Sequence, residues 1–214
     1  MTAFATLLDG YSRFRAGPYE EQRRRFDRLA AEGQSPPVMI IACSDSRVDP
    51  ARIFDVAPGE VFVLRNVANL VPPYEPDGGQ HGASAAIEFA VTQLGVAEIV
   101  VLGHAQCGGI SASLTGRFEG AAAGEGGFIA RWMAMIEPAR VAAIVQAADC
   151  GSDAQHLLEL AAIRLSLANL RSFPFVAERV ADGRLALRGA WFSIADGSLS
   201  ILGEQDFSVL ALQS

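Results

Sequence analysis

Pro37-Val-Met-Ile-Ile-Ala-Cys43 and Ala97-Glu-Ile-Val-Val-Leu-Gly-His104 are two short apolar runs, and each ends on a residue that can bind a metal. Runs of this length, rich in Ile and Val, are typical of buried strands in a parallel sheet. Cys107 follows three residues after the second run. Because open parallel sheets bind ligands beyond the carboxyl ends of their strands, two such neighbouring strands would bring Cys43, His104 and Cys107 together.

The rest of the chain alternates between strand-like and helix-like segments. A second apolar strand is expected at 60–66, and a long helix at 81–94 precedes the run that ends at His104. The Asp196-Gly197 turn indicates a hairpin between residues 185–192 and 198–202. This order predicts an α/β fold with a central, mostly parallel sheet of four strands, an antiparallel edge strand and helices on both faces.

The first 35 residues differ from this alternating core. Apolar side chains recur at helical spacing among them, at Leu7, Leu8, Tyr11 and Phe14. We therefore predict one domain over residues 1–214, with an N-terminal helical arm at 1–35 and an α/β core at 36–214. Apolar faces on an arm need a partner to cover them, so we expect a homodimer or a dimer of dimers.

Composition excludes several classes of function. Half of the residues are hydrophobic, 19% are charged and the formal net charge is −7, so the chain is globular and no nucleic-acid partner is expected. No apolar run reaches the ~18 residues of a membrane span, and the N-terminus does not resemble a secretory signal. Three cysteines form no even disulfide framework, which favours a cytoplasmic location, with Cys150 as a buried or partly buried bystander.

The three strand-end residues have the chemistry of a zinc site. Two thiolates and one imidazole supply three of the four ligands that zinc takes, which is typical of a catalytic site with one open position. The alternative is two unrelated buried thiols and a core histidine. The agreement of all three positions with strand ends favours the metal site.

Cys43 is followed by Ser44-Asp45-Ser46-Arg47, which suggests a catalytic pair. A turn after Cys43 would place the Asp45 carboxylate beside the open metal position. Arg47 would then hold that carboxylate ionised through a two-pronged bond. The alternative is a surface ion pair that contributes little.

Gly108 and Gly109 have two possible uses after Cys107. Their backbone amides would stabilise a nearby thiolate or bind an anion at a helix start. Alternatively, the missing side chains only allow close packing of a helix on the sheet. Both uses are compatible with the sequence.

The segments Cys43-Ser-Asp-Ser-Arg47 and His104-Ala-Gln-Cys107-Gly-Gly resemble the paired signature of the beta-class carbonic anhydrases. The resemblance continues through 58–60, 65–69 and 71–74, so it is dense over residues 34–115 and looser in the tail. Ala42 and Val71-Pro72-Pro73 resemble the plant-type subtype with an open active site.

The resemblance implies Cys43, His104 and Cys107 as ligands of one Zn²⁺ per chain, with water or hydroxide as the fourth ligand. It implies hydration of carbon dioxide to bicarbonate and a proton by zinc-bound hydroxide, with Asp45 and Arg47 as the orienting pair. The remaining residues that it assigns to the substrate pocket are Gln34, Phe62, Val67 and Phe89, together with Gly108 and Gly109.

The sequence departs from the family at two positions and leaves rival functions open. Some plant-type members have a tyrosine where Phe89 stands and a histidine near Gln93, and neither titratable group is present here. One rival function is a hydrolase of the same build that acts on carbon disulfide or carbonyl sulfide. Others are a non-catalytic zinc protein and a redox dithiol protein that uses Cys43 and Cys107.

Overall fold

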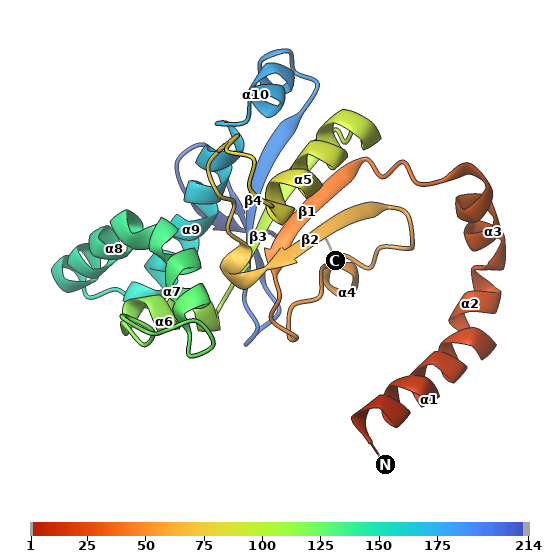
Figure 1. The fold of residues 1–214 in the computed structure, drawn as a ribbon, viewed down its shortest axis with the longest axis horizontal. Helices are drawn as coiled ribbons and strands as arrows, with labels where there is room; N and C mark the ends of the chain where they lie inside the picture. Colours follow the sequence, from red (N-terminus) through yellow and green to blue (C-terminus); the bar gives the residue numbers. More distant parts are fainter. Residues whose placement is uncertain (1, 212–214) are drawn as a thin grey trace.

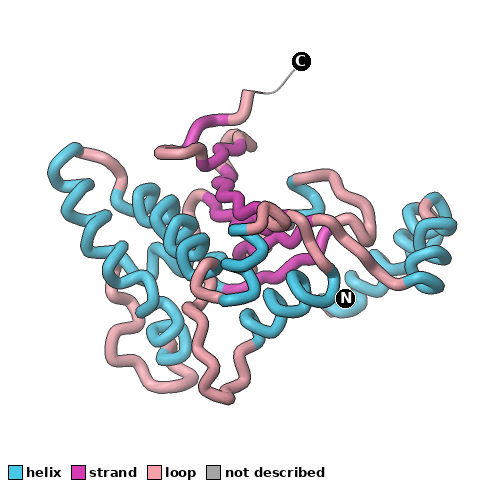
Figure 2. Tube along the Cα trace, turned by 90° about the horizontal axis from the view of Figure 1, so that it is seen from above, coloured by secondary structure: helices cyan, strands magenta, loops and turns pink. Residues whose placement is uncertain are grey.

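The computed structural model describes residues 2–211, which form one six-stranded sheet with helices around it and an N-terminal arm (Figure 1). The strand order is β2-β1-β3-β4-β5-β6. Figure 2 shows the strands running through the middle of the molecule. Within the described residues, no helix has the length and apolar character that crossing a lipid bilayer requires.

Four neighbouring parallel strands make up one side of the sheet, with β2 at its edge. They are β1 (Val38–Cys43), β2 (Val61–Asn66), β3 (Glu98–His104) and β4 (Ala186–Phe192). β1 lies between β2 and β3, and β4 pairs with the far side of β3. The predicted, mostly parallel sheet of four strands is confirmed. The buried runs rich in Ile and Val form neighbouring parallel strands, and helices connect them along the chain.

The antiparallel edge is also confirmed, and it is wider than expected. β5 (Leu199–Leu202) pairs antiparallel with β4 through the turn that contains Asp196 and Gly197. Gly197 has a φ of +73°, a conformation that glycine adopts without strain. A further strand, β6 (Phe207–Val209), pairs with β5 and was not predicted, because three residues are too short to give a periodic signal.

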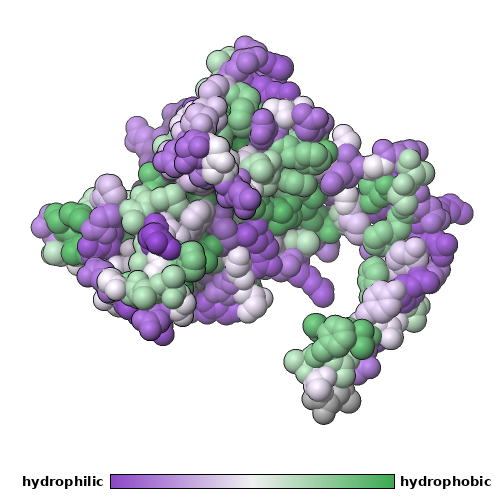
Figure 3. Space-filling model, in the orientation of Figure 1, coloured by the Kyte–Doolittle hydropathy of each residue, from purple (hydrophilic) through white to green (hydrophobic). Residues whose placement is uncertain are grey.

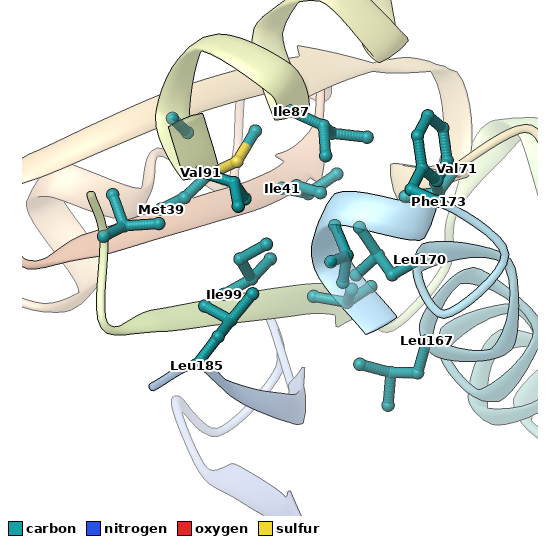
Figure 4. Packing of buried hydrophobic residues seen from close by; sticks show 14 of the residues in the cluster. Met39, Ile41, Val71, Ile87, Val91, Ile99, Leu167, Leu170, Phe173 and Leu185 are labelled. Carbon is teal, nitrogen blue, oxygen red and sulfur yellow. The ribbon is translucent and has the colours of Figure 1, made fainter. Parts of the chain in front are cut away.

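One face of the sheet carries the larger hydrophobic core. Three helices cover it: α5 (Gly82–Glu88), α9 (Ala154–Leu170) and α10 (Pro174–Ala181). Met39, Ile41 and Ile99 point from the strands toward these helices (Figure 4). The helical side chains that meet them include Ile87, Val91, Leu167 and Leu170.

The opposite face has a smaller cluster around Ile40, Ala42, Leu102 and Ala190. The short helix α4 (Pro50–Ile53) packs Ile53 against this face. Helices therefore lie on both faces of the sheet as predicted, although three helices cover one face and only the short α4 packs on the other.

The helix predicted at 81–94 is present, but its winding changes in the middle. α5 continues without a break into η2 (Phe89–Leu94), a π-helical segment. Its end shows the wider hydrogen-bond pattern, since the Gly95 N–H donates to the carbonyl of Ala90, five residues earlier. Sequence periodicity alone does not distinguish this winding from an α-helix.

The segment after β3 forms a helical layer beside the carboxyl ends of the strands. It contains α6 (Gly108–Leu114), α7 (Gly127–Met133), the 3₁₀ turn η3 (Ala134–Ile136) and α8 (Glu137–Cys150). The prediction that Cys150 is buried or partly buried was wrong, because Cys150 is exposed. α8 buries only Ala143, so the last turn of this helix faces solvent.

The arm is helical, as predicted, and most of it projects away from the core (Figure 1). It consists of α1 (Ala3–Ala16), α2 (Pro18–Glu21) and α3 (Arg23–Glu32). α3 is fixed to the core because Arg25 donates to the carbonyl of Pro58 at 3.1 Å and pairs with Glu60 at 3.0 Å. α1 buries none of its residues within the chain.

Ile163 of α9 fills the space above two strand glycines. An added Cβ at Gly103 of β3 would lie 2.6 Å from Ile163 Cδ1, and one at Gly189 of β4 would lie 3.0 Å from Cγ2. α9 can therefore pack closely on the strand that ends in His104. This contact helps to fix the height of α9 above the end of β3.

We expect Ile163→Ala to lower the free energy of unfolding by about 2 to 5 kcal/mol, because it removes a fully buried side chain over glycines that cannot fill the cavity. Urea unfolding followed by circular dichroism measures this change. Ile144→Ala on α8 is the control, since Ile144 is 41% exposed and its loss should cost about 0.5 kcal/mol or less. Equal losses in the two variants would contradict this account of the core.

Candidate metal centre

Cys43, His104 and Cys107 come together at the carboxyl ends of two adjacent strands. Cys43 is the last residue of β1, His104 is the last residue of β3, and Cys107 caps the start of α6. All three are buried, and one possible ligand atom from each lies within 4.8 Å of the others. The strand-end prediction therefore describes their placement correctly.

The hydrogen bond of His104 fixes which ring nitrogen is free. Nδ1 lies 2.8 Å from the carbonyl oxygen of Ala105, and a carbonyl can only accept, so Nδ1 carries the hydrogen. Nε2 is buried and has no hydrogen-bond partner in residues 2–211. An orphaned nitrogen lone pair beside two sulfurs is costly without a cation, and a histidine that binds a metal is oriented through its other nitrogen in this way.

The two sulfur atoms lie 4.0 Å apart. The pKa of the Cys43 thiol is lowered to about 4, first because its thiolate accepts a hydrogen bond from Cys107. The pKa of Cys107 is raised, mainly by the same interaction. Two buried thiolates at this distance repel, so the pair holds one proton unless a cation neutralises both.

The donor set and its spacing fit zinc. A tetrahedral ion with Zn–S bonds of ~2.3 Å would separate two sulfurs by about 3.8 Å, close to the observed 4.0 Å. Within the described residues, the cluster contains no fourth His, Cys, Asp or Glu ligand. Three protein ligands and one position for water are typical of a catalytic rather than a structural zinc site.

Backbone amides stabilise both thiolates. The backbone amides of Asp45 and Ala68 help to lower the pKa of Cys43, and those of Gly109 and Ile110 act to lower the pKa of Cys107. Each amide therefore favours the charged form of the sulfur near it.

The two glycines after Cys107 differ in what they do. An added Cβ at Gly109 would lie 2.8 Å from Val67 Cγ1 and 3.3 Å from the Ala68 Cβ, so only glycine allows this close approach. Gly108 has nothing within 4 Å of such an atom. Gly109 thus agrees with both uses considered from the sequence, since its amide acts to lower the pKa of Cys107 and its missing side chain allows close packing.

Asp45 and Arg47 form a two-pronged pair next to the thiolates. Arg47 Nε and its backbone N–H both donate to Asp45 Oδ1 at 2.9 Å, and Nη2 donates to Oδ2 at 2.7 Å. Nη2 also donates to the carbonyl of Gln106 at 3.0 Å, which ties the pair to the loop before Cys107.

These bonds set the ionisation of Asp45. The Arg47 side chain is the largest cause that holds the pKa of Asp45 well below its usual range. Asp45 is therefore a charged acceptor over the physiological pH range. The contribution of this pair to folding is present above the unfolded carboxyl pKa of ~3.9 and is lost as the pH falls below it.

Arg65 of β2 fixes the loop that carries Asp45. Its Nε donates to the carbonyl of Cys43 at 2.9 Å, and its Nη2 donates to the carbonyl of Asp45 at 2.6 Å. A guanidinium has five donors in a rigid fork, which suits it to hold several carbonyls of one loop. In the sequence Arg65 was noted only as part of the family motif, because a contact across strands leaves no local signal.

Glu159 of α9 is the second site residue that the sequence did not reveal. It is only 4% exposed, and Oε1 accepts the backbone N–H of Cys107 at 3.1 Å. Gln155 also donates to Oε1, and the Trp191 indole donates to Oε2, both at 3.1 Å. A buried carboxylate thus fixes the backbone of one ligand from the helix behind it. The only sequence signal is an acidic residue on the buried face of an apolar helix.

The pocket residues implied by the resemblance fall into two groups. Val67 lies beside the ligands, in the turn that follows β2, and Gly108 and Gly109 begin α6. Phe62 contacts Phe89 with ring centroids 5.9 Å apart, but Phe62 pairs with Met39 near the other end of the sheet.

Phe62 precedes Asn66, the partner of Cys43, by four residues, which is about 13 Å along a strand. Gln34 is exposed and lies before β1, also at the end away from Cys43. Within a single chain, Gln34, Phe62 and Phe89 therefore lie far from Cys43, His104 and Cys107. The roles of Gln34, Phe62 and Phe89 stay predictions.

Comparison with known proteins relates this site to a family. The carbonic anhydrase family model matches residues 38–199. Beta carbonic anhydrase 3 of Arabidopsis thaliana is 36% identical over 209 residues, which cover 97% of this chain and 79% of that protein.

Solved structures give the same relationship. The beta-carbonic anhydrase CcaA has a TM-score of 0.86 and 30% identity, covering 99% of this chain and 92% of its own. One of two tetrameric beta-carbonic anhydrases from Sordaria macrospora has a TM-score of 0.80 and 28% identity, covering 97% and 98%. The beta-carbonic anhydrase CafA of Aspergillus fumigatus has a TM-score of 0.81 and 26% identity, covering 96% and 93%.

We expect Glu159→Gln to weaken metal retention about 10- to 100-fold. The NH₂ group of the new glutamine would face at least one of the N–H donors whose hydrogen bonds the carboxylate now accepts, so that bond would be lost. Transfer of zinc to a chromogenic chelator measures this change. Glu178→Gln is the control, because Glu178 is an exposed partner of Arg184. Retention equal to that of the original protein in Glu159→Gln would exclude this role for Glu159.

Proposed function

Because the chain belongs to the beta class of the carbonic anhydrase family and is a carbonic anhydrase, we propose that it hydrates carbon dioxide reversibly with one Zn²⁺ per chain, held by Cys43, His104 and Cys107. The products are bicarbonate and a proton. The observation that carries the proposal is a buried three-donor cluster with a charged carboxylate fixed beside it, outside the ligand set.

Each ligand has a defined part in holding the metal. The His104 Nε2 lone pair faces the cluster because Nδ1 is committed to Ala105. The sulfurs of Cys43 and Cys107 supply two negative charges that match a divalent cation. Zinc, when bound, acts as a Lewis acid that makes water a nucleophile near neutral pH.

Asp45 has the geometry of an orienting base. Its Oδ1 accepts two hydrogen bonds and its Oδ2 accepts one, so Oδ2 keeps accepting capacity. We assign to Oδ2 the hydrogen of the attacking water, which aims the water's lone pair at the carbon of carbon dioxide. Arg47 keeps this carboxylate ionised and prevents it from turning toward the metal.

The substrate pocket requires an apolar wall, and one chain supplies only part of it. Val67 is 39% exposed beside the ligands, whereas Phe62 and Phe89 lie at the opposite end of the strands. We propose that Gln34, Phe62 and Phe89 of one subunit complete the pocket of a neighbouring subunit. Their distance from the ligands of their own chain supports this arrangement.

A second copy of the chain is also the best candidate to cover the arm. Hydrophobic residues of α1 lie on its open surface (Figure 3), and Leu7 is 69% exposed. Phe4, Leu8 and Tyr11 are at least half exposed as well. A relative with a matching fold is described as tetrameric. We therefore propose a homodimer, or a dimer of dimers, in which α1 packs on a neighbouring subunit.

We expect Asp45→Asn to lower kcat for carbon dioxide hydration about a hundredfold or more while zinc content stays at one per chain. Asparagine keeps the shape but loses the charge and half of the acceptor capacity. Stopped-flow hydration with a pH indicator, together with metal analysis, measures both quantities. Glu178→Gln is the remote control.

These assays also separate the rival functions. An original protein with zinc but no hydration activity would favour a non-catalytic zinc protein. Full hydration activity in Asp45→Asn would exclude the role assigned to Asp45. Faster turnover of carbon disulfide or carbonyl sulfide than of carbon dioxide, measured side by side, would favour the hydrolase. A zinc-free protein with both thiols free would favour redox chemistry.

We expect the double variant Leu7→Asp, Tyr11→Asp to reduce the assembly to a smaller species, because two charges would enter an apolar interface. Light scattering coupled to size exclusion measures the mass. Asp9→Asn, on the same helix, is the matched control and should keep the original mass. An unchanged mass in the double variant would contradict the proposed role of α1.

A further inference from the structure

The N-terminal arm docks on the core at the turn before β2. Arg25 of α3 donates from Nη1 to the carbonyl of Pro58 at 3.1 Å and lies 3.0 Å from Glu60 Oε1. Within residues 2–211, no other hydrogen bond or ion pair links the arm to the core. A guanidinium that holds a carbonyl and a carboxylate together fixes the direction of the helix that carries it.

An apolar contact supports the same docking. Leu29 of α3 lies over Gly59, where an added Cβ would be 2.7 Å from Leu29 Cδ2 and 3.0 Å from Cδ1. Gly59 also has a φ of +88°, a conformation that favours glycine. A residue with a side chain at this position would push Leu29 away from the turn. The bare backbone of Gly59 therefore allows α3 to lie against the core.

The carboxylate of Glu60 holds both the arm and its own turn. Its Oε1 pairs with Arg25, whereas its Oε2 accepts the backbone N–H of Ala57 at 2.9 Å. Glu60 directly precedes β2, in which Phe62 is the second residue. The helix α3 is therefore fixed relative to the start of the strand that carries Phe62.

The docking also limits where Gln34 can lie. At the end of α3, the N–H of Gly33 donates to the carbonyl of Leu29 at 3.0 Å. On the other side, Pro36 is buried just before β1. Only Gln34 and Ser35 lie between these two fixed points, and both are exposed. The backbone of Gln34 is thus held in place as long as α3 stays docked.

We propose that Arg25 is a positioning residue, which holds Gln34 at a fixed place relative to Phe62 by docking α3 on the turn before β2. Arg25 acts through the backbone of Gln34 and not by contact with substrate. The inference rests on the role proposed for Gln34 and Phe62 in the pocket of a neighbouring subunit. A side chain that serves another subunit needs such a support, because a misplaced group contributes little to the reaction.

We expect Arg25→Gln to lower kcat/KM for carbon dioxide hydration about tenfold, which is the effect of losing one typical hydrogen bond, here that of Gln34 to substrate. Zinc content and the mass of the assembly should stay as in the original protein. Leu29→Ala removes the apolar part of the docking and should act in the same direction. Arg24→Gln is the matched control, since Arg24 lies on the same helix and, within the described residues, makes no bond to the turn.

A double-mutant cycle tests whether Arg25 acts through Gln34. Gln34→Ala should lower kcat/KM by a similar factor, and adding Arg25→Gln to it should cause no further fall. Losses that multiply in the double variant, or full activity in Arg25→Gln, would overturn the inference. Full activity in Gln34→Ala would instead refute the pocket role of Gln34 itself, and the inference with it.

A nitroxide spin label follows the segment without reference to activity. The label is attached at Ser35→Cys in a protein whose exposed Cys150 is replaced by serine, and bound zinc protects the ligand thiols from it. Electron paramagnetic resonance should show slow label motion in this protein and after Arg24→Gln, and faster motion after Arg25→Gln. Equal motion in all three proteins would overturn the proposal, whatever the hydration assays show.

Discussion

Two buried sulfur atoms held 4.0 Å apart are the constraint on which the rest of the site depends. Cys43 and Cys107 belong to different strand–loop units, and the parallel pairing of β1 with β3 brings them together. Negative charge at this spacing is unfavourable without a cation, so the fold creates a site that is completed by binding a metal. The carboxylate of Glu159 and the guanidinium of Arg65 bind the backbone of Cys107 and Cys43, respectively.

Different residues fix the proposed metal ligands and position the carboxylate proposed to act in catalysis. On the inner side, the hydrogen bond between Glu159 of α9 and the Cys107 N–H fixes the backbone of that residue. On the open side, Arg65 and Arg47 fix the loop and the carboxylate of Asp45. Arg47 donates hydrogen bonds to both carboxylate oxygens of Asp45. The carboxylate is therefore held as a hydrogen-bond acceptor beside the cluster instead of serving as a fourth ligand.

The sequence predicted what depends on local pattern and strand order. Buried runs that end in Cys43 and His104 were enough to place the ligands, and the Asp196-Gly197 turn was enough to place the edge hairpin. Glu159 and Arg65 were missed because their bonds to Cys107 and Cys43 span 52 and 22 residues of chain. The exposure of Cys150 was misjudged, since cysteine content alone does not say which helix face meets the core.

The π-helical winding of Phe89–Leu94 makes chain length, rather than residue type, the sensitive variable in that segment. A wider turn accommodates one residue more than an α-helical turn would. Deletion of one residue there would restore regular winding and rotate the residues before the deletion by roughly 100° about the helix axis relative to those after it. In an alignment of this family, a gap at this position therefore indicates a change in how the ring of Phe89 lies relative to Phe62.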